Sequence, residues 1–416
     1  MKITNLKARQ ILDSRGVPTI ECSLVLDNGV VVTSSVPAGK SKGSYEVYEM
    51  RDGDPNHFGG QGVLKAVGII NNVIAPMLIG SDPDVIGMDQ VLCSADGRHD
   101  KSKLGGNSIL AVSIAVARAQ AMVEGVHLFT LINQLWSLPK PTIPTCQFNL
   151  INGGMHAANG LSVQEFLIIP RVPDFSLALE CADTIYQTLK ELLQRQGLAI
   201  SIGDEGGFAP RFNTAGRVPE FDALMLLQQA ASEAGFSQGH VGLGLDVAAT
   251  HLYDRETETY RLHDASLSAT ELISWYRTVV ESYGLLSLED PLGEDDWDGW
   301  KLATGVLGKH IQLVGDDLFA TNIERIDKGA ALGIANAVLI KPNQIGTVTE
   351  TVLAIKRCQE VGYKTIVSHR SGETNDTFIV DLAVGTSADQ LKAGAPVRGE
   401  RVAKYNRLLD IAQILG

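Results

Sequence analysis

The chain has 416 residues, of which 44% are hydrophobic and 20% are charged, and this composition excludes an intrinsically disordered protein. Its formal net charge of −13 disfavours sequence-independent binding to nucleic acid or to an anionic membrane. Because 416 residues exceed what one compact core usually holds, we expect two domains, or one large barrel with an appendage.

Cysteine usage and the first residues of the chain lead us to expect a cytoplasmic protein. The five cysteines are scattered without metal-binding spacing, which is typical of reduced thiols in the cytosol. The first residues contain no apolar core of signal-peptide length. The longest apolar segment, residues 109–123, includes Arg118 and is too short to span a bilayer. We predict a buried helix there and no association with a membrane.

The first pattern along the chain is typical of a β-hairpin. Residues 20–33 alternate apolar and polar side chains on either side of an Asp-Asn-Gly turn at 27–29. The loop at 37–43 follows and contains two glycines, two lysines and Ser41. Such a loop could bind an anion or form a solvated turn.

Helical patterns follow, and then a break. Residues 60–125 are predicted to be mostly helical, with the last helix beginning at the N-cap residue Asn107. The proline-rich segment 138–144 is the best domain boundary in the chain. We therefore predict an α+β domain at residues 1–135 and a second domain at residues 136–416.

Short apolar runs alternate with helical patterns throughout the second domain, which predicts parallel strands with helices outside them. The number of units favours a closed (β/α)₈ barrel over an open sheet. The predicted strands are 147–151, 165–170, 198–202, 241–246, 285–289, 311–316, 337–341, 364–368 and 390–392. The predicted helices are 175–196, 219–234, 269–283, 322–332, 347–361, 374–384 and 399–415. Counted in this order, the run that ends at Lys341 is the seventh strand.

Three consecutive predicted strands end in a carboxylate, at Asp246, Glu289 and Asp316. Parallel strands place all of their carboxyl ends at one rim of a barrel, so we expect these side chains to meet. Each could instead cap a helix at a βα turn. Three in consecutive units favour a metal site, and an all-oxygen ligand set without His or Cys favours Mg²⁺.

The next three predicted strands end in cations. They deliver Lys341, the sequence Ser-His-Arg-Ser at 368–371, and Lys392. Lys341 could be a lysine that extends to the surface, and 368–371 could be an ordinary polar loop. Their place after three acidic strand ends favours an anion site, in which Arg370 and Ser371 suit a phosphate group.

Further polar residues lie near the earlier strand ends. Asp204 and Glu205 lie between glycines, which permit a close approach of the backbone to a ligand. His156 lies in a Gly- and Asn-rich loop, and Gln164 and Glu165 begin an apolar run. Each of these could be purely structural.

An acid, a lysine, a carboxylate metal site and an anion site at one rim suit the removal of a proton next to a carboxylate. In this reading a lysine takes the proton, and an acid on the opposite side assists the departure of a hydroxyl group. We expect the positive charge near Lys341 to lower its pKa, so that the neutral amine can act as a base.

The residues also resemble one family, the enolases, over essentially the whole chain. The motifs that carry the resemblance are Asp13-Ser14-Arg15-Gly16, Glu165-Phe166, Gly203-Asp204-Glu205-Gly206-Gly207-Phe208-Ala209-Pro210, Gly244-Leu245-Asp246-Val247-Ala248-Ala249, Glu289-Asp290-Pro291, Gly315-Asp316-Asp317-Leu318, Asn343-Gln344-Ile345-Gly346, Ser368-His369-Arg370-Ser371-Gly372-Glu373-Thr374 and Lys392-Ala393-Gly394-Ala395-Pro396.

The resemblance implies the reversible dehydration of 2-phosphoglycerate to phosphoenolpyruvate, with a lysine base and Mg²⁺ ions. Lys341 corresponds to that base, and Glu205, with Glu165 beside it, corresponds to the acid that helps the C3 hydroxyl to leave. The positions that correspond to ligands of the first metal ion are Asp246, Glu289 and Asp316. The positions that correspond to substrate-binding residues are His156, Gln164, His369, Arg370, Ser371 and Lys392. Ser41 corresponds to a loop serine that binds the second Mg²⁺.

The resemblance also implies a small α+β domain followed by a modified (β/α)₈ barrel, and a homodimer or an octamer of dimers. One loop departs from the family pattern, because residues 38–43 read Ala-Gly-Lys-Ser-Lys-Gly where the family usually has Ser-Gly-Ala-Ser-Thr-Gly. Two alternatives to a working enolase therefore stay open. One is a homologue with a related substrate, such as a carboxyphosphonoenolpyruvate synthase, and the other is a binding protein without catalysis.

Overall fold

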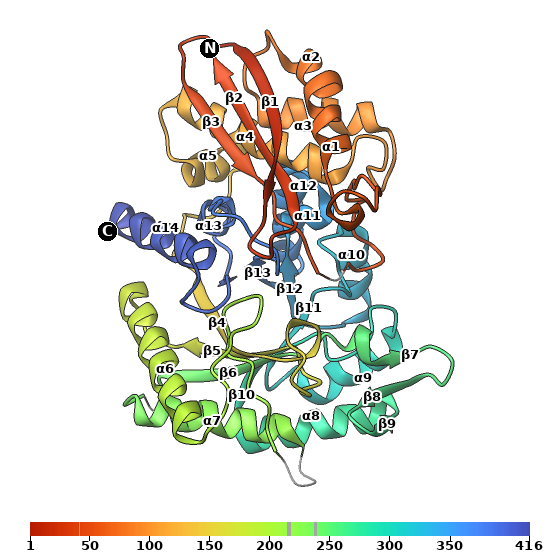
Figure 1. The fold of residues 1–416 in the computed structure, drawn as a ribbon, viewed down its shortest axis with the longest axis vertical. Helices are drawn as coiled ribbons and strands as arrows, with labels where there is room; N and C mark the ends of the chain where they lie inside the picture. Colours follow the sequence, from red (N-terminus) through yellow and green to blue (C-terminus); the bar gives the residue numbers. More distant parts are fainter. Residues whose placement is uncertain (41, 214–217, 237–238) are drawn as a thin grey trace.

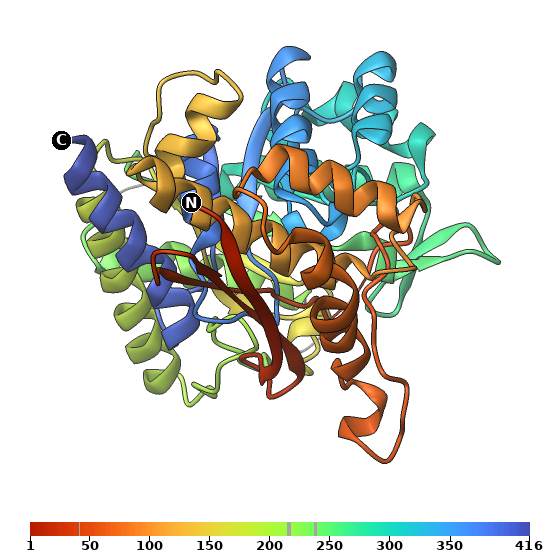
Figure 2. The ribbon, with the colours of Figure 1, turned by 90° about the horizontal axis from the view of Figure 1, so that it is seen from above.

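A three-stranded sheet and a group of helices form an N-terminal domain, which lies against one end of a closed barrel (Figure 1). The computed structural model describes residues 1–40, 42–213, 218–236 and 239–416. Seen from above, the sheet and the helices of this domain lie over the barrel strands (Figure 2). The predicted α/β class, a smaller α+β domain followed by a barrel, is confirmed.

The N-terminal sheet contains the predicted hairpin and one further strand. Strands β2 (Pro18–Leu26) and β3 (Val31–Ser35) pair antiparallel around the 27–29 turn. Strand β1 (Ile3–Leu12) pairs with the other edge of β2 and was not predicted. Its register shifts between Ile3 and Asn5, and this shift breaks the two-residue alternation on which strand prediction depends.

Helices cover one side of this sheet. They are η1 (Phe58–Gly60), α1 (Leu64–Ile69), the π-helical turn η2 (Ile70–Ile74), α2 (Ala75–Leu78), α3 (Val85–Asp96), α4 (Gly106–Glu124) and α5 (Leu128–Leu135). Helix α4 is long and apolar enough to cross a membrane, but most of it is buried inside the protein, as predicted for this segment. The predicted N-cap at Asn107 is wrong, because the Asn107 side chain accepts a hydrogen bond from the backbone of Met50 instead.

Eight strands close the barrel in the order β10-β11-β12-β13-β14-β4-β5-β6, with β6 pairing back to β10. They are β4 (Thr145–Asn152), β5 (Glu165–Pro170), β6 (Val241–Asp246), β10 (Leu285–Glu289), β11 (Gln312–Gly315), β12 (Ala337–Ile340), β13 (Lys364–Ser368) and β14 (Gln390–Lys392). The predicted strand at 198–202 is wrong, since only Ile202 pairs there, in an isolated bridge with Phe208. Lys341 therefore follows the sixth barrel strand, not the seventh.

Strand β5 runs antiparallel to both of its neighbours, β4 and β6, whereas we expected parallel strands throughout. Only the loop 153–164, with the short turn η3 (Gly154–His156), joins β4 to β5, and so short a connection without a crossover helix suits an antiparallel pair. The reversal places the first residue of β5, Glu165, opposite Asp246 at the end of β6. Glu165 thus reaches the rim at which its neighbours end.

The barrel helices match the predicted positions, with three differences. They are α6 (Phe175–Arg195), α7 (Pro219–Glu233), α8 (Ala269–Tyr283), α9 (Trp297–Leu307), α10 (Ile323–Leu332), α11 (Pro342–Ile345), α12 (Val348–Glu360), α13 (Phe378–Gly385) and α14 (Gly399–Leu415). Helix α9, whose Gly299 and Gly305 weaken the helical pattern, was not predicted, and neither was the short helix α11. Helix α13 begins at Phe378, four residues later than predicted. Between β6 and α8 lie η4 (Ala249–Leu252) and a small antiparallel sheet of β7 (Tyr253–Asp254), β8 (Thr259–Leu262) and β9 (Ala265–Leu267).

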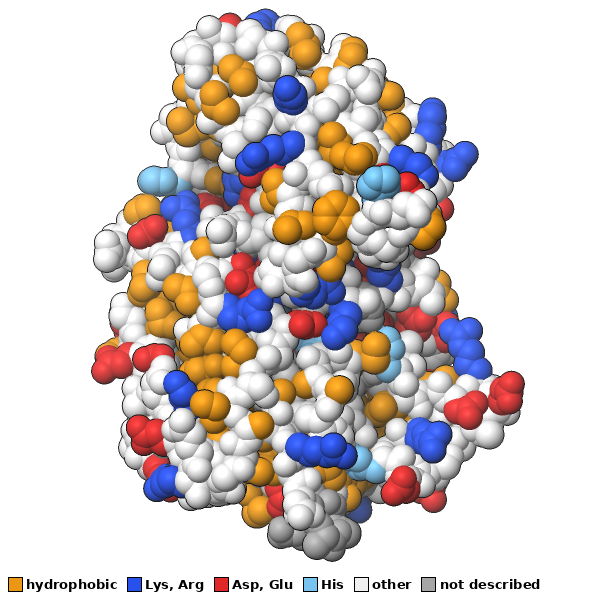
Figure 3. All heavy atoms as spheres, in the orientation of Figure 1, with side chains coloured by type: hydrophobic (Ala, Val, Ile, Leu, Met, Phe, Trp, Pro, Cys, Tyr) orange, Lys and Arg blue, Asp and Glu red, His pale blue; other side chains and the backbone are white. Residues whose placement is uncertain are grey.

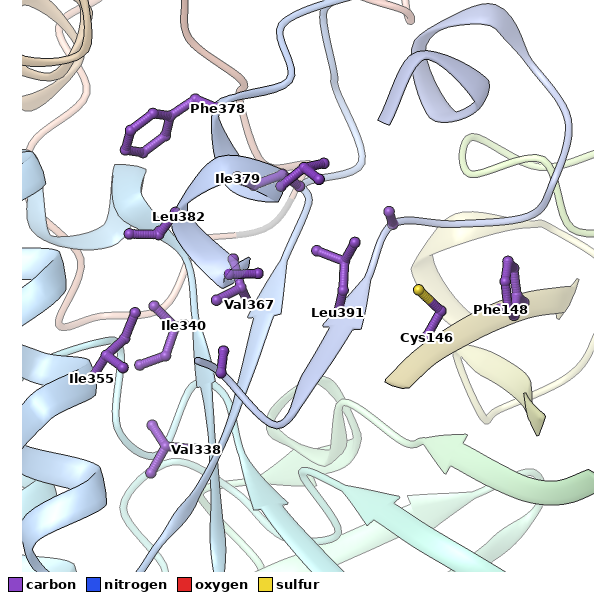
Figure 4. Packing of buried hydrophobic residues seen from close by; sticks show 14 of the residues in the cluster. Cys146, Phe148, Val338, Ile340, Ile355, Val367, Phe378, Ile379, Leu382 and Leu391 are labelled. Carbon is purple, nitrogen blue, oxygen red and sulfur yellow. The ribbon is translucent and has the colours of Figure 1, made fainter. Parts of the chain in front are cut away.

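Hydrophobic side chains fill the space between the barrel strands and their helices. Leu382 of α13 and Ile355 of α12 lie beside Ile340 and Val367 of the strands (Figure 4). Deeply buried strands such as β12, all of whose side chains are inaccessible, explain the continuous apolar runs in the sequence. This rigid core fixes where each strand ends, and hence where the polar rim residues lie.

One of the ion pairs that join the N-terminal domain to the barrel is formed by Arg118 and Asp376, and it is largely shielded from solvent. Arg118 of α4 donates to both carboxylate oxygens of Asp376, over 2.7 and 2.8 Å. Asp376 also accepts from the backbone N–H groups of Ser35, in β3, and Phe378, at the start of α13. Burial raises the pKa of Asp376, but Arg118 lowers it more strongly, so the net direction is downward. The carboxylate therefore holds three elements together in its ionised form.

We predict that Asp376→Asn destabilises the protein at neutral pH by about 2 kcal/mol, because it leaves Arg118, whose side chain is largely but not fully shielded from solvent, without its counter-ion. The effect should shrink as the pH falls through the lowered pKa of Asp376, since protonation then removes the same charge from the wild type. Urea unfolding between pH 3 and 7 measures this. Asp327→Asn is the control, because it removes a pair with Arg357 that is largely exposed and should change the midpoint little. Equal effects of the two substitutions would contradict the prediction.

Candidate active site

One pocket at the rim of the barrel, facing the N-terminal domain, brings the predicted site residues together. Of those that the structure describes, all except Glu289 line it; Ser41 lies outside the described residues. The lining residues are Gly39, Lys40, His156, Gln164, Glu165, Glu205, Asp246, Ala248, His251, Asp290, Asp316, Asp317, Lys341, Ser368, His369, Arg370, Ser371 and Lys392. Acidic and basic side chains lie next to one another across the middle of the molecule's face, between the domain and the barrel (Figure 3).

The buried ammonium group of Lys392 lies among three carboxylates. Its Nζ is 3.1 Å from Glu165 Oε2, 3.1 Å from Asp246 Oδ2 and 2.9 Å from Glu289 Oε2. Burial lowers the pKa of Lys392, but Asp246, Glu165 and Glu289 outweigh it, and the net direction is well above the ordinary value. Lys392 therefore stays charged and partly offsets the repulsion between these carboxylates.

Lys341 contacts the third predicted metal ligand. Its Nζ donates to Asp316 Oδ2, and the other oxygen of Asp316 accepts from Gln344 Nε2 over 3.0 Å. Burial lowers the pKa of Lys341, but contact with Asp316 raises it more, so the net direction is upward. We expected a lowered pKa from nearby positive charge. Arg370 does act in that direction, but the carboxylate is in direct contact and dominates.

Asp290, next to Glu289, organises the backbone of the neighbouring strand end. Its two oxygens accept from the N–H groups of Asp316 and Asp317, both over 2.8 Å, and its φ of 40° is unusual for a residue other than glycine. Burial and the Asp316 charge raise the pKa of Asp317 to about 8. Burial also raises the pKa of Asp290 and of Glu289 well above the ordinary range. This part of the site has more negative charge than its cations offset.

A pair of carboxyl groups, Glu165 and Glu205, lies across the pocket from Lys341. His156 Nδ1 is 3.7 Å from an oxygen of each. Asn149 donates to Glu205 Oε2 over 3.0 Å, and His369 Nε2 lies 3.5 Å from the same oxygen. Burial and the charge of Glu205 raise the pKa of Glu165 well above its ordinary value. Burial raises the pKa of Glu205, but His156 and His369 lower it more, and the net direction is downward. The two carboxyl groups therefore titrate as a coupled pair, in which Glu165 is the more readily protonated member.

The barrel topology puts this pair opposite the lysine. In the closed order of eight strands, β12, which Lys341 follows, and β5, which Glu165 begins, are four strands apart in either direction. A ligand in the pocket would thus meet Lys341 on one side and the coupled carboxyl pair on the other. This is the arrangement that proton removal on one face and proton donation on the other requires.

The predicted anion-binding residues are held by contacts from the N-terminal domain. Arg370 donates to both oxygens of Glu46, over 3.0 and 3.1 Å. Ser371 Oγ accepts from the backbone N–H of Lys40 over 2.8 Å, and Arg15 lies 3.4 Å from the same oxygen. The loop before residue 41 therefore lies directly against the predicted phosphate-binding residues.

Three residues that support the site were missed by sequence reasoning. Glu46 and the fully buried Arg401 lie far along the chain from their partners, and nothing in the sequence pairs them. Arg401 donates to the carbonyl oxygens of Arg370 and Ser371 and lies 2.6 Å from His369 Nδ1. Asn149 could have been found from the sequence, because it is a polar residue within the apolar run of β4 and is thus a candidate for the barrel interior.

The residues present fit a bound cation. Two groups of side chains have possible ligand atoms within 4.8 Å of one another, which is close enough to share an ion. The first consists of Asp290, Asp316 and Asp317, and the second of His156, Glu165 and Glu205. Of the predicted metal ligands, Asp316 belongs to the first group, whereas Asp246 and Glu289 surround Lys392. The buried Gln164 Oε1 accepts no hydrogen bond from any described residue. Oxygen donors in excess of their cations are what a hard divalent ion binds.

A divalent cation should therefore raise the melting temperature of the protein, because binding to the folded state stabilises it by mass action. Removing the ion with a chelator should reverse the shift. The Asp246→Asn and Glu289→Gln variants should each need at least about tenfold more cation for the same shift in melting temperature. Even residues that only support the ligands of a metal ion change its affinity by about that factor. Glu281→Gln, at an exposed helix position, is the control. No shift of the wild type with Mg²⁺, Mn²⁺ or Ca²⁺ would contradict the prediction.

Comparison with known families agrees with this geometry. A family model described as the enolase N-terminal domain matches residues 3–132, and one described as the enolase C-terminal TIM barrel domain matches residues 140–416. Together they cover nearly the whole chain, and the resemblance seen in the sequence is confirmed. Since the matched segments correspond to the N-terminal domain and to the closed barrel that carries the pocket, the chain belongs to the enolase family.

Proposed function

We propose that the chain catalyses the reversible dehydration of 2-phospho-D-glycerate to phosphoenolpyruvate and water, the enolase reaction of glycolysis and gluconeogenesis. The observation that carries the proposal is the placement of Lys341 and the Glu165–Glu205 pair on opposite sides of one pocket. A substrate with an acidic proton on one carbon and a hydroxyl group on the next would present the proton to Lys341 and the hydroxyl group to the carboxyl pair.

In this proposal Lys341 takes the proton from C2 of the substrate, and the carboxyl pair supplies a proton to the departing C3 hydroxyl. Burial and the charge of Glu205 raise the pKa of Glu165, and Glu205 lies 3.7 Å from His156. Either carboxyl can deliver the proton, because the two respond to each other's charge. Lys392 faces the substrate carboxylate, and Arg370 and Ser371 bind its phosphate.

Mg²⁺ is the cofactor that we propose, with two ions per site, the first held by Asp246, Glu289 and Asp316 and the second involving Ser41. When bound, the ions would offset the negative charge that gathers on the substrate carboxylate, and would compete with Lys341 for Asp316. Lys341 must lose its proton before it can act as a base, so its contact with Asp316 has to weaken in the reacting complex. His156, Gln164 and His369 complete the wall of the pocket. A homodimer or octamer of dimers and a cytoplasmic location stay predictions.

We predict turnover of 2-phosphoglycerate with Mg²⁺, followed by the absorbance of the enol product. Lys341→Ala should abolish exchange of the C2 proton with solvent, because no other described lysine in the pocket lies opposite the acid pair. Metal binding, measured by thermal shift, should persist in this variant. Exchange at the wild-type rate in Lys341→Ala would show that the base is another residue, and a wild type inactive on 2-phosphoglycerate would contradict the proposed function.

A second candidate function is the same proton-abstraction chemistry on a related substrate, as in carboxyphosphonoenolpyruvate synthase. Lys40 favours it, because this lysine lines the pocket, and its Nζ lies 3.2 Å from Asp204 Oδ2. Lys42 instead pairs with Glu49, 2.5 Å away, and does not line the pocket. A cation over the pocket mouth could bind an additional anionic group of a substrate.

We therefore expect the two lysines to behave differently. Lys40→Ala should raise the KM of the true substrate several-fold and weaken its salt dependence, because it removes one pocket cation. Lys42→Thr is the matched control and should change neither quantity. The assay compares 2-phosphoglycerate with a phosphonate substrate. Turnover of the phosphonate alone would favour the second function, and unchanged KM and salt dependence in both variants would show that neither lysine contributes.

A further inference from the structure

The loop that joins β4 to β5, residues 153–164, presents two pocket residues, His156 and Gln164. Its ends pair with each other: Gly153 donates its N–H to the carbonyl of Gln164 over 2.9 Å, and Gly154 donates to Leu161 over 3.0 Å. Gln164 in turn donates its backbone N–H to the carbonyl of Asp246. The pocket side of the loop is thus tied to the barrel rim.

The opposite side of the same loop is held from outside the pocket by Glu220, in the first turn of α7. The Glu220 side chain is fully buried. Its Oε1 accepts from the backbone N–H of Ser162 over 2.7 Å and lies 3.4 Å from that of Val163. These are the two residues before Gln164, so their position determines where the Gln164 side chain begins. A buried carboxylate is costly unless it is paired, and its partner is a histidine.

That partner is His263, which lies between β8 and β9 with a φ of 54°. His263 Nε2 is 2.6 Å from Glu220 Oε2, and its backbone N–H donates to Ser162 Oγ over 3.3 Å. The side chain is one-quarter exposed. The charged groups that act on it are Glu220 and the neighbouring Asp264, and hydrogen bonding to Glu220 raises its pKa although burial lowers it. The imidazole can therefore carry the charge that the buried carboxylate needs.

We propose that Glu220 and His263 are positioning residues, which hold the 153–164 loop so that His156 and Gln164 face the pocket. Neither Glu220 nor His263 lines the pocket, and the pair acts through the backbone of Ser162 and Val163. The small β7–β9 sheet, which presents His263, thereby gains a role in the reaction. The kinetic part of this inference rests on the proposed function, whereas the structural part does not.

Hydrogen exchange measured by mass spectrometry on the peptide that covers Ser162 and Val163 tests the structural part. His263→Ala and Glu220→Gln should each increase exchange of this peptide by roughly tenfold, the effect of losing about one charge-assisted hydrogen bond. His263→Lys, which keeps a cation, should restore much of the protection. His57→Ala is the matched control, because His57 also pairs with a carboxylate, Asp54, at 2.8 Å, but in an exposed part of the N-terminal domain.

The pH dependence gives an independent readout. Because the pKa of His263 is raised in the folded protein, the protection should be complete below the ordinary histidine pKa of about 6.5 and decrease as the pH rises through the raised value. Protection is expressed relative to the intrinsic exchange rate at each pH. The His263→Lys variant should show no decrease over the same range, since the lysine stays charged there.

Activity completes the test. His263→Ala should lower kcat/KM for 2-phosphoglycerate by several-fold. It should also lower the melting temperature, because it leaves the buried Glu220 carboxylate without its partner, so kcat/KM is compared at a temperature at which both proteins are folded. Unchanged exchange at 162–163 in both folded variants would overturn the proposal. So would increased exchange with wild-type kcat/KM, which would make the pair merely structural. If Glu220→Gln fails to fold, His263→Ala decides alone. Absence of wild-type turnover would contradict the proposed function and leave the exchange result valid.

Discussion

The rim of the barrel depends on the balance between buried carboxylates and the few cations among them. Neighbouring strands β6, β10 and β11 end at Asp246, Glu289 and Asp316, and in a medium of low polarity such groups repel one another strongly. Lys392 and Lys341, from two other strand ends, lie within contact of these three groups. The cations offset part of the charge, and burial, together with the charges of Asp246 and Asp316, still raises the pKa of Glu289. A site of this kind can bind a divalent ion and an anionic substrate together.

The direction of β5 decides which residues can take part in this balance. A parallel β5 would place Glu165 at the far end of the barrel, away from Asp246 and Lys392. The antiparallel strand instead brings Glu165 into contact with Lys392 and opposite the strand that Lys341 follows. The same connection leaves the 153–164 loop at the rim, where Glu220 and His263 contact it. Reversal of one strand thus accounts for both the acid side of the pocket and its support.

Sequence patterns, with the family resemblance, predicted most of the fold and most of the residues that the pocket brings together, and the failures have physical causes. Strands buried on both faces, such as β12, appear as unbroken apolar runs, so their carboxyl ends, with Lys341, could be placed. Strand direction could not, because β5 is as apolar as the parallel strands of the barrel. Contacts between distant segments, such as Glu46 with Arg370, have no local signal. The pKa of Lys341 was mispredicted because the outcome depends on which of several charges is in direct contact.

The position of Arg401 has a consequence for the synthesis of the protein. This residue lies in the last helix, α14, and its guanidinium group holds the backbone and the side chain of residues 369–371. A nascent chain on the ribosome can form the N-terminal domain and most of the barrel strands before α14 has been made. The anion-binding end of the pocket cannot adopt its final arrangement until that helix has left the exit tunnel. This end of the pocket is therefore completed late, after the barrel strands have been made, however early the N-terminal domain folds.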